Sequence, residues 1–296
     1  MQGIVYHYLR NTSQEFPNLK YLNKKNFIKQ IKYLNKKKKI SNFENKKKNS
    51  FFLSFDDGLK EHLWAARKLK KLNLSAIFFI NSYPLIKKDF LKVHKVHLLL
   101  GKYNYKILYS KLKSICKIDE IKVNKKYREM KRYQFNKAKS QDEIKSLELK
   151  VLLNSTSFDN ESSIVNDLFN LFFTKKKQKK LFNKFYLNLQ EIHKIKNMGM
   201  KIGAHSHSHF LMTSLNKKNL IQEIDTFKKF LVKNKLRTNL FSYPYGFKGS
   251  YNSVTNNLLL KKNFKELFVV TNPNQKNQKN MISRLNCNYF KHGQIK

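Results

Sequence analysis

The stretch SFFLSFDDGLKEHLWAARKLKKLNLSAIFFIN, residues 50–81, contains a complete structural unit of an α/β protein. Its apolar run at 50–55 predicts a buried strand that leads directly into two aspartates. Residues 59–73 have the apolar spacing of an amphipathic helix, and the run at 75–81 predicts a second strand. Two strands joined through a helix form a parallel crossover, so this stretch predicts an α/β fold.

The same alternation of strands and helices appears towards both ends of the chain. The segment GIVYHYL (3–9) predicts a first strand, and strand and helix patterns alternate again from about 187 to a last strand, MISRLN (281–286). Between them, from about 89 to 186, the pattern is helical or irregular. We therefore predict a single domain over residues 1–296, a (β/α) barrel with a helical insertion at about 89–186.

The chain is strongly basic, with 62 Lys and Arg against 19 Asp and Glu and a formal net charge of +43. Such a charge is typical of a protein that binds a polyanion. Only six of the basic residues are arginine, and the lysines are spread along the whole chain, as a compositional bias would also produce. Because specific readers of nucleic acid depend on arginine, we expect nonspecific attraction to polyanions and no specific nucleic-acid partner.

The cysteine content and the hydropathy of the chain indicate the cellular compartment in which we expect the protein. Two cysteines cannot build a disulfide framework, which suits a reducing environment. The N-terminal residues lack the pattern of a signal peptide, and no run approaches the ~18 apolar residues of a membrane span. We therefore expect a cytoplasmic protein, and the sequence leaves its oligomeric state open.

Three polar motifs follow three of the predicted strands: SFDDG (54–58), HSHSH (205–209) and SYPYG (242–246). The carboxyl ends of parallel strands meet at one rim of a barrel. We therefore expect these motifs, distant in sequence, to lie together.

The histidine motif contains three imidazoles, of which His205 and His209 have three residues between them. Two imidazoles and one carboxylate form the three-ligand set of a catalytic zinc site, with positions left for water and substrate. The same set suits non-haem Fe²⁺. A chance cluster of surface histidines, or a loop that caps the next helix, is the alternative interpretation.

Adjacent carboxylates at the end of an apolar strand are costly unless a cation lies near them. With a cation, one of Asp56 and Asp57 can bind it while the other acts as a base. The alternative is an ordinary turn and helix N-cap. The third motif supplies no metal ligand, but its Pro-Tyr-Gly turn can direct a backbone N–H at a reacting oxygen, unless it is only a strand-exit turn.

Together the three motifs resemble those of the polysaccharide deacetylase family, the NodB-homology fold of carbohydrate esterase family four. The family motif T-F-D-D-G is similar to residues 54–58, H-[ST]-x-x-H matches 205–209, and a third motif ends in P-Y-G, as 244–246 do. The similar segments cover the start of the chain, 50–82 and roughly 187–285. The middle resembles the helical insertion of members associated with surface-glycan and sugar biosynthesis.

The resemblance implies a distorted (β/α) barrel and a role for each motif residue. Asp57, His205 and His209 would hold a divalent metal, usually zinc. Asp56 would be the general base that activates water for attack on the carbonyl carbon of an N-acetyl group. The backbone N–H of Tyr245 would help to stabilise the oxyanion.

Two positions depart from the family pattern. Ser242 stands where the family often has an arginine that orients the base, and the late Leu-His motif that supplies a general acid is absent. Because the first and last strands of a barrel are neighbours, we expect Arg284 to replace the missing cation and His7 the missing acid. A purely structural His7 is the alternative.

We therefore predict a metal-dependent hydrolase that removes an N-acetyl or other acyl group from an N-acetylated sugar or glycan-biosynthesis intermediate. Two alternatives stay open. One is a related carbon–nitrogen hydrolase acting on a non-sugar amide. The other is an inactive, basic module on the same fold that binds a glycan or nucleic acid.

Overall fold

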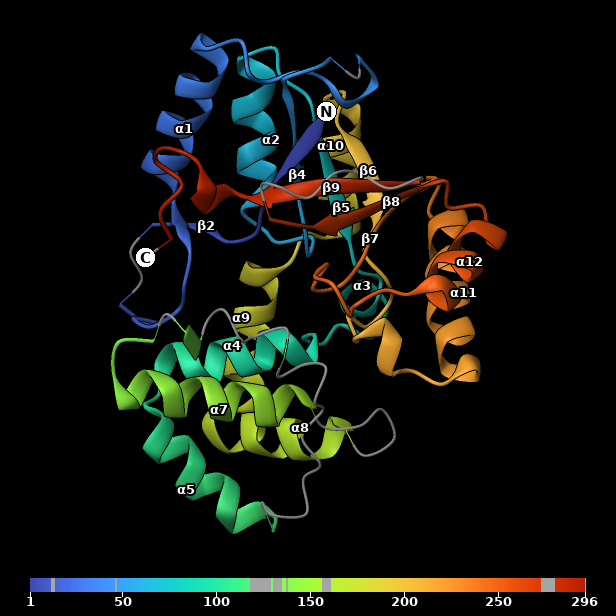
Figure 1. Ribbon diagram of the computed structural model, residues 1–296. Helices are drawn as coiled ribbons and strands as arrows, with labels where there is room; N and C mark the ends of the chain where they lie inside the picture. Colours follow the sequence, from blue (N-terminus) through green and yellow to red (C-terminus); the bar gives the residue numbers. More distant parts are fainter. Residues whose placement is uncertain are drawn as a thin grey trace. The chain divides into compact units, whose positions relative to one another are not determined.

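The structure of the chain is a computed structural model, which describes residues 1–11, 14–45, 47–117, 129, 135–136, 138–155, 161–272 and 280–295, with only the backbone at 161–163. Within these residues seven parallel strands close into a barrel (Figure 1). In spatial order they are β1 (Gln2–Tyr6), β4 (Phe51–Phe55), β5 (Ala76–Ile80), β6 (Lys201–Ala204), β7 (Leu240–Ser242), β8 (Glu266–Val270) and β9 (Met281–Asn286). The predicted α/β barrel is confirmed.

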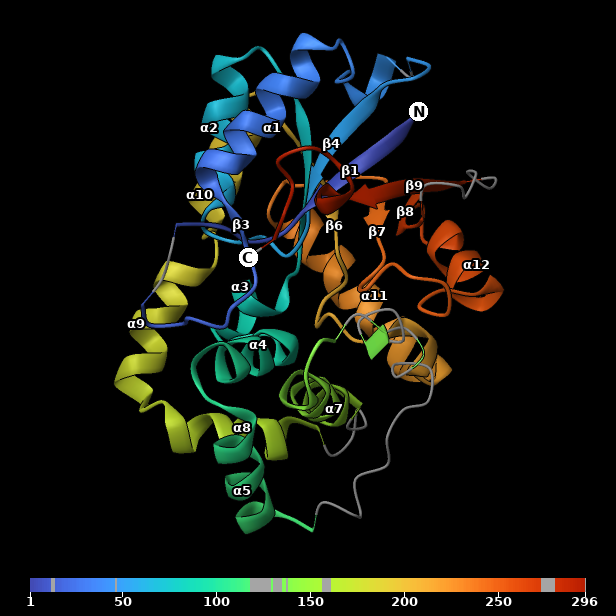
Figure 2. The same ribbon diagram turned by 60° about the vertical axis from the view of Figure 1, so that its left-hand side comes forward.

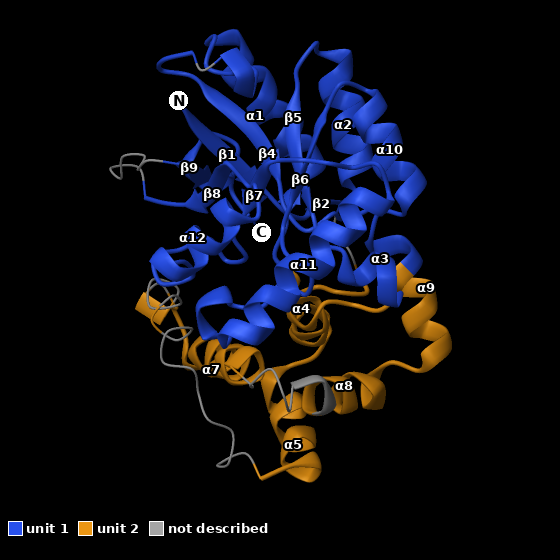
Figure 3. Ribbon diagram, turned by 90° about the vertical axis from the view of Figure 1, so that its right-hand side faces the viewer, with its two compact units in different colours: residues 1–12, 20–88, 183–296 blue, residues 13–19, 89–182 orange. Residues whose placement is uncertain are grey.

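The chain forms two compact units, drawn in different colours in Figure 3. The first, residues 1–12, 20–88 and 183–296, holds the barrel. The second, residues 13–19 and 89–182, is helical and overlaps the predicted insertion. That residues 1–296 act as a single domain stays a prediction.

Helices of the first unit follow the strands and cover the outside of the barrel. They are α1 (Lys24–Lys36), α2 (His62–Lys71), α3 (Tyr83–Lys87), α10 (Leu189–Asn197), α11 (Lys217–Lys233) and α12 (Ser253–Lys261). α2 and α10 lie side by side, as both views of the ribbon show (Figures 1 and 2). Two short strands, β2 (Leu9–Arg10) and β3 (Leu22–Asn23), pair in a separate sheet. No helix in the described residues is long and apolar enough to cross a membrane.

Asparagine side chains begin several of these helices. Asn23 accepts a hydrogen bond from an N–H in the first turn of α1, and Asn216 does the same for α11. Asn188 and Glu191 cap α10 reciprocally. Since asparagine is among the best N-cap residues, an asparagine-rich chain can start its helices wherever apolar periodicity follows.

Strand alternation divides the core into two layers. Phe52 from β4 and Phe268 from β8 touch inside the barrel, with ring centroids 5.7 Å apart, and Phe79 from β5 lies 4.9 Å from Phe268. Alternate residues such as Leu53 and Phe55 pack outwards in the larger core shared with the helices. Residue 56 therefore has the parity of Phe52 and faces the barrel interior.

Two glycines make room for this aromatic filling. A Cβ at Gly203 would lie 2.3 Å from the Phe79 ring, and one at Gly3 would lie 2.4 Å from the Phe52 ring. β6 and β7 are joined through a single residue pair, Ala204 with Phe241. This is the joint with the fewest paired residues in the described part of the barrel.

The second unit has its own aromatic core. Its helices are α4 (Lys92–Lys102), α5 (Tyr105–Ile115), α7 (Gln141–Ser155) and α8 (Glu161–Phe172), and α9 (Lys175–Phe185) begins in it. Phe90 and Phe173 both pack on Phe169, with ring centroids 5.6 and 4.6 Å from it. The buried Lys95 ammonium pairs with Asp89 at 2.7 Å, which satisfies its charge inside this unit.

Candidate active site

The three sequence motifs meet at the carboxyl rim of the barrel. β4 ends at Phe55, β6 at Ala204 and β7 at Ser242, and the motif residues follow directly. His205 also continues the sheet, because its N–H donates to the carbonyl of Ile80 at 2.9 Å. The topology thus brings together side chains that lie about 150 residues apart in the sequence, as expected for parallel strands.

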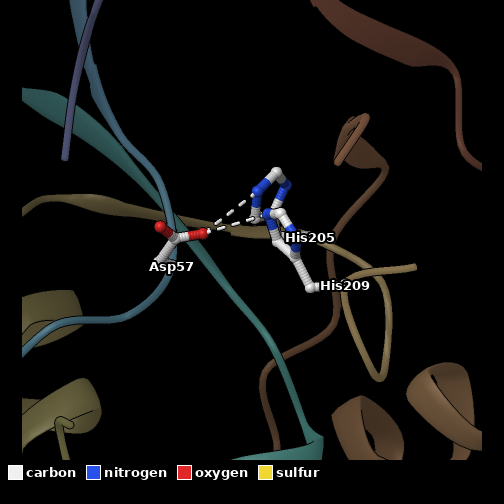
Figure 4. Close-up of side chains that lie close together, drawn as sticks. All are labelled: Asp57, His205 and His209. Carbon is white, nitrogen blue, oxygen red and sulfur yellow. Dashed lines mark ion pairs between the residues drawn. The ribbon is translucent and has the colours of Figure 1, made fainter. Parts of the chain in front are cut away.

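Asp57, His205 and His209 form the centre of this rim (Figure 4). The Nε2 atoms of the two histidines each lie 3.4 Å from Oδ1 of Asp57. The three potential ligand atoms lie within 4.8 Å of one another, and all three side chains are buried. The cluster is compact enough for its three atoms to face one small cation.

A carbonyl oxygen fixes the tautomer of His205. Its Nδ1 lies 2.8 Å from the carbonyl oxygen of Ser242, which can only accept, so Nδ1 carries the hydrogen. In the neutral ring Nε2 then presents its lone pair to Asp57. Burial lowers the pKa of His205, but the Asp56 and Asp57 carboxylates outweigh it and leave the pKa raised.

The residues present fit a divalent metal. Two imidazole nitrogens and one carboxylate oxygen match a catalytic zinc or non-haem iron set. A hydrogen bond from the far nitrogen of a ligating histidine to a carbonyl, as His205 makes to Ser242, is the usual support for such a ligand. A cation bound between these atoms would offset the repulsion of their converging lone pairs.

Asp56 lies beside the cluster in a buried ion pair with Arg284. The guanidinium Nη1 and Nη2 donate to Oδ1 and Oδ2 of Asp56 at 2.7 and 2.9 Å. Ser242 accepts from Nη2 at 2.6 Å and donates to Oδ2 at 3.1 Å. Burial raises the pKa of Asp56, but the Arg284 and His205 charges outweigh it, so the pKa is lowered and the carboxylate is ionised.

Strand register explains how Arg284 reaches this position. It lies in β9, beside Gly3 of β1 and Val270 of β8. The side chain is fully buried, and the guanidinium lies 5.2 Å from the centre of the Phe79 ring. The structure thus brings Arg284 to Asp56, and its role as the replacement for an arginine at position 242 stays a prediction.

The Arg284→Gln variant is expected to lose about 3–5 kcal/mol of unfolding free energy at pH 7, because the Asp56 carboxylate is left buried without its partner. In the native chain Asp56 has a lowered pKa, so its stabilisation is present above about pH 4 and is lost as the pH falls through the folded pKa. In the variant, burial without the guanidinium raises the pKa of Asp56. The difference in unfolding free energy between wild type and variant therefore becomes smaller towards pH 3. Urea unfolding at pH 7 and pH 3.5 measures both effects. An equal loss in the exposed-arginine control Arg237→Gln would contradict the argument.

His7 and Tyr245 also lie at this centre. His7 follows the last residue of β1, and burial lowers its pKa, while the charges of Asp57 and Asp56 oppose the shift. The Tyr245 ring packs edge-on against His209 with centroids 5.0 Å apart. Asp57 and Tyr245 have positive φ angles of 81° and 64°, a strained backbone typical of functional sites. The role of His7 as general acid and the role of the Tyr245 N–H as oxyanion donor stay predictions.

Several residues that support the site were not predicted from the sequence. Buried His62 accepts from the Leu59 N–H at 3.2 Å and bonds the His7 carbonyl at 3.0 Å, linking the first motif to β1. Asn81 donates to the carbonyl of His205, and buried Glu223 accepts from the loop after it. Their partners are backbone groups brought near by the fold, which leaves no pattern in the sequence.

Comparison with known proteins identifies the fold. The family model described as "Polysaccharide deacetylase" matches residues 167–285, which include His205, His209, Tyr245 and Arg284. No protein of curated function matches the chain in sequence.

Among solved structures, the chain is similar to the deacetylase PplD of Streptococcus pyogenes, with 14% identity, a TM-score of 0.55 and coverage of 97% of this chain and 91% of that one. It is similar to a de-N-acetylase from Aggregatibacter actinomycetemcomitans, with 12% identity, a TM-score of 0.56 and coverage of 96% and 93%. It is also similar to IcaB from Ammonifex degensii, with 13% identity, a TM-score of 0.51 and coverage of 96% and 91%. The family match over residues 167–285 and the shared barrel fold agree with the resemblance seen in the sequence: the chain has the fold of these deacetylases.

Proposed function

We propose that the chain is a metal-dependent hydrolase that removes the acetyl group from an N-acetylated sugar or glycan-biosynthesis intermediate. The observation that carries the proposal is the convergence of Asp57, His205 and His209 beside a second, ionised carboxylate, Asp56. Three ligands and an adjacent base are the parts that amide hydrolysis by a metal enzyme requires. Similarity to deacetylases supports the choice of an N-acetyl substrate.

Asp57, His205 and His209 would hold the metal, for which we propose zinc. A divalent ion there supplies positive charge that polarises the acetyl carbonyl and lowers the pKa of water. The Ser242 carbonyl and the Ile80 carbonyl hold His205 through its ring and its backbone, so its Nε2 is directed before any ligand binds.

Asp56 would accept the proton that the attacking water gives up. Its Oδ2 lies 3.9 Å from Nε2 of His205, so the carboxylate borders the ligand cluster. Arg284 holds it in one orientation and keeps it ionised. A base must be unprotonated and correctly placed, and this ion pair provides both conditions.

Tyr245 and His7 would complete the reaction. The turn at Tyr245 would direct its backbone N–H at the oxyanion that forms on the attacked carbonyl. His7 would give a proton to the leaving amine, which is a poor leaving group without one.

The His7→Ala variant is therefore expected to lower turnover by about 10²- to 10³-fold with its metal content unchanged, because only proton delivery is lost. Turnover across pH 5–9 and elemental analysis of the same preparation measure the two quantities. His193→Ala, on α10, is the matched control and should retain turnover. Wild-type turnover in His7→Ala would assign the proton to another group.

Acetate release tests the proposed function directly. The purified chain, with its metal measured, is incubated with a panel of N-acetylated sugars and nucleotide sugars, before and after removal of metal by a chelator. We expect acetate from at least one substrate, loss of release with the chelator and recovery with added zinc. Release from non-sugar amides alone would favour the related hydrolase. Binding of glycans by a metal-free chain without release would favour the inactive module.

A further inference from the structure

A buried carboxylate lies against the loop that carries both histidines of the metal cluster. Glu223 belongs to α11, and only 3% of its surface is exposed. The N–H of Ser208 donates to its Oε1 at 2.5 Å. Burial raises the pKa of Glu223, and the hydrogen bond from the Ser208 backbone N–H opposes that shift. The carboxylate thus holds the backbone of Ser208, one residue before His209.

The loop needs such support because its backbone is strained. Ser206 and His209 have φ angles of 63° and 61°, in the left-handed region that residues other than glycine rarely adopt. The Ser206 hydroxyl accepts from the N–H of His209 at 3.0 Å. Two successive backbone N–H groups of the loop are therefore held by side chains, that of Ser208 by Glu223 and that of His209 by Ser206.

The same carboxylate has no ion pair with Lys, Arg or His among the described residues. An unpaired buried carboxylate is costly, and the hydrogen bond that offsets part of the cost here comes from this loop. The contacts of Glu223 are therefore directed at the loop and not at charge neutralisation.

We propose that Glu223 is a positioning residue that fixes the 206–208 loop and thereby sets the affinity of the His205 and His209 pair for a divalent metal. The proposal rests on the proposed function, since it requires that these histidines bind a metal. Groups that orient ligands from outside the ligand set commonly change metal affinity by 10- to 100-fold when removed.

The test compares Glu223→Gln with Asp225→Asn. Both remove one negative charge from α11, but Asp225 pairs with Lys262 and has no hydrogen bond to the loop among the described residues. Zinc dissociation constants are measured by competition with a chromogenic chelator, together with the unfolding free energy of each metal-free protein. We expect Glu223→Gln to bind zinc about 10- to 100-fold more weakly than wild type. Asp225→Asn should stay within about twofold of wild type, because its ligand loop is intact.

A second variant tests the same loop if Glu223→Gln does not fold. Ser206→Ala removes the hydroxyl that accepts from the His209 N–H and keeps the Glu223 carboxylate, so it should also loosen the loop and weaken zinc binding, by about 10-fold. If the folded variants bind zinc as tightly as wild type, Glu223 is only a structural residue and the proposal is overturned. If wild type itself binds no zinc or other divalent metal, the proposed metal site is wrong, which is a different result.

Discussion

Replacing His205 with alanine should abolish both stoichiometric metal binding and turnover. The side chain supplies one of three ligand atoms and also borders the proposed base, with Nε2 at 3.4 Å from Asp57 and 3.9 Å from Asp56. A cavity in its place leaves two ligands, too few for a tightly held catalytic ion. We expect turnover to fall by about 10⁴-fold or more, with metal content measured on the same sample by elemental analysis.

His207→Ala is the matched control for this prediction. It lies in the same loop, but its Nδ1 bonds the Ser82 hydroxyl at 2.8 Å and its ring packs against Tyr83. Burial and the Lys87 charge lower the pKa of His207 to about 4, so its ring is neutral at pH 7 and its removal changes no charge. We expect His207→Ala to keep its metal. A His205→Ala protein that still holds one metal ion per chain would refute the ligand assignment.

The Asp56→Asn variant should retain metal and lose turnover by about 10⁴-fold, because an amide cannot accept the proton from water. Asparagine can still accept one hydrogen bond from Arg284, so the side chain keeps its place while its charge is lost. Metal content and circular dichroism check that the site and the fold survive. Acetate release then isolates the chemical step.

Ser242→Ala is the control for this second prediction. It removes one hydrogen bond to Asp56 and one from Arg284, yet leaves the carboxylate and the Ser242 carbonyl that holds His205. We expect it to lose less than about 10-fold in turnover. If Asp56→Asn lost no more activity than Ser242→Ala, the proton would have to go to another group.

The architecture followed from local patterns in the sequence. The strands at β4 and β5 were predicted because each is a short apolar run next to a helical pattern, and parallel pairing then required the motif residues to share one rim. The structure adds strand parity, because residues with the parity of Phe52 face the barrel interior and Asp56 follows them there. Local pattern was sufficient here because the tertiary contacts agree with it.

Side-chain contacts were predicted only where neighbouring strands imply them. The contact between Arg284 and Asp56 was expected because the last strand of a barrel lies beside the first. Glu223 was missed, since it appears in the sequence only as one polar position in an amphipathic helix. His62 was missed for the same reason, and both act on backbone groups that any residue could supply. The composition of the second unit predicted helices and contained no indication of what they do.

Because β6 and β7 share a single residue pair, His205 also helps to hold these two strands together. Beyond Ala204 and Phe241, the next link between these strands is the imidazole of His205, which donates to the carbonyl of Ser242. The imidazole of His205 therefore links β6 to β7 through Nδ1 and belongs to the ligand cluster through Nε2. By reciprocity, an ion that binds the closed arrangement more tightly also holds the two strands together by the same free energy. An ion bound at the site would therefore stabilise the pairing of β6 with β7, and separating the two strands would weaken its binding.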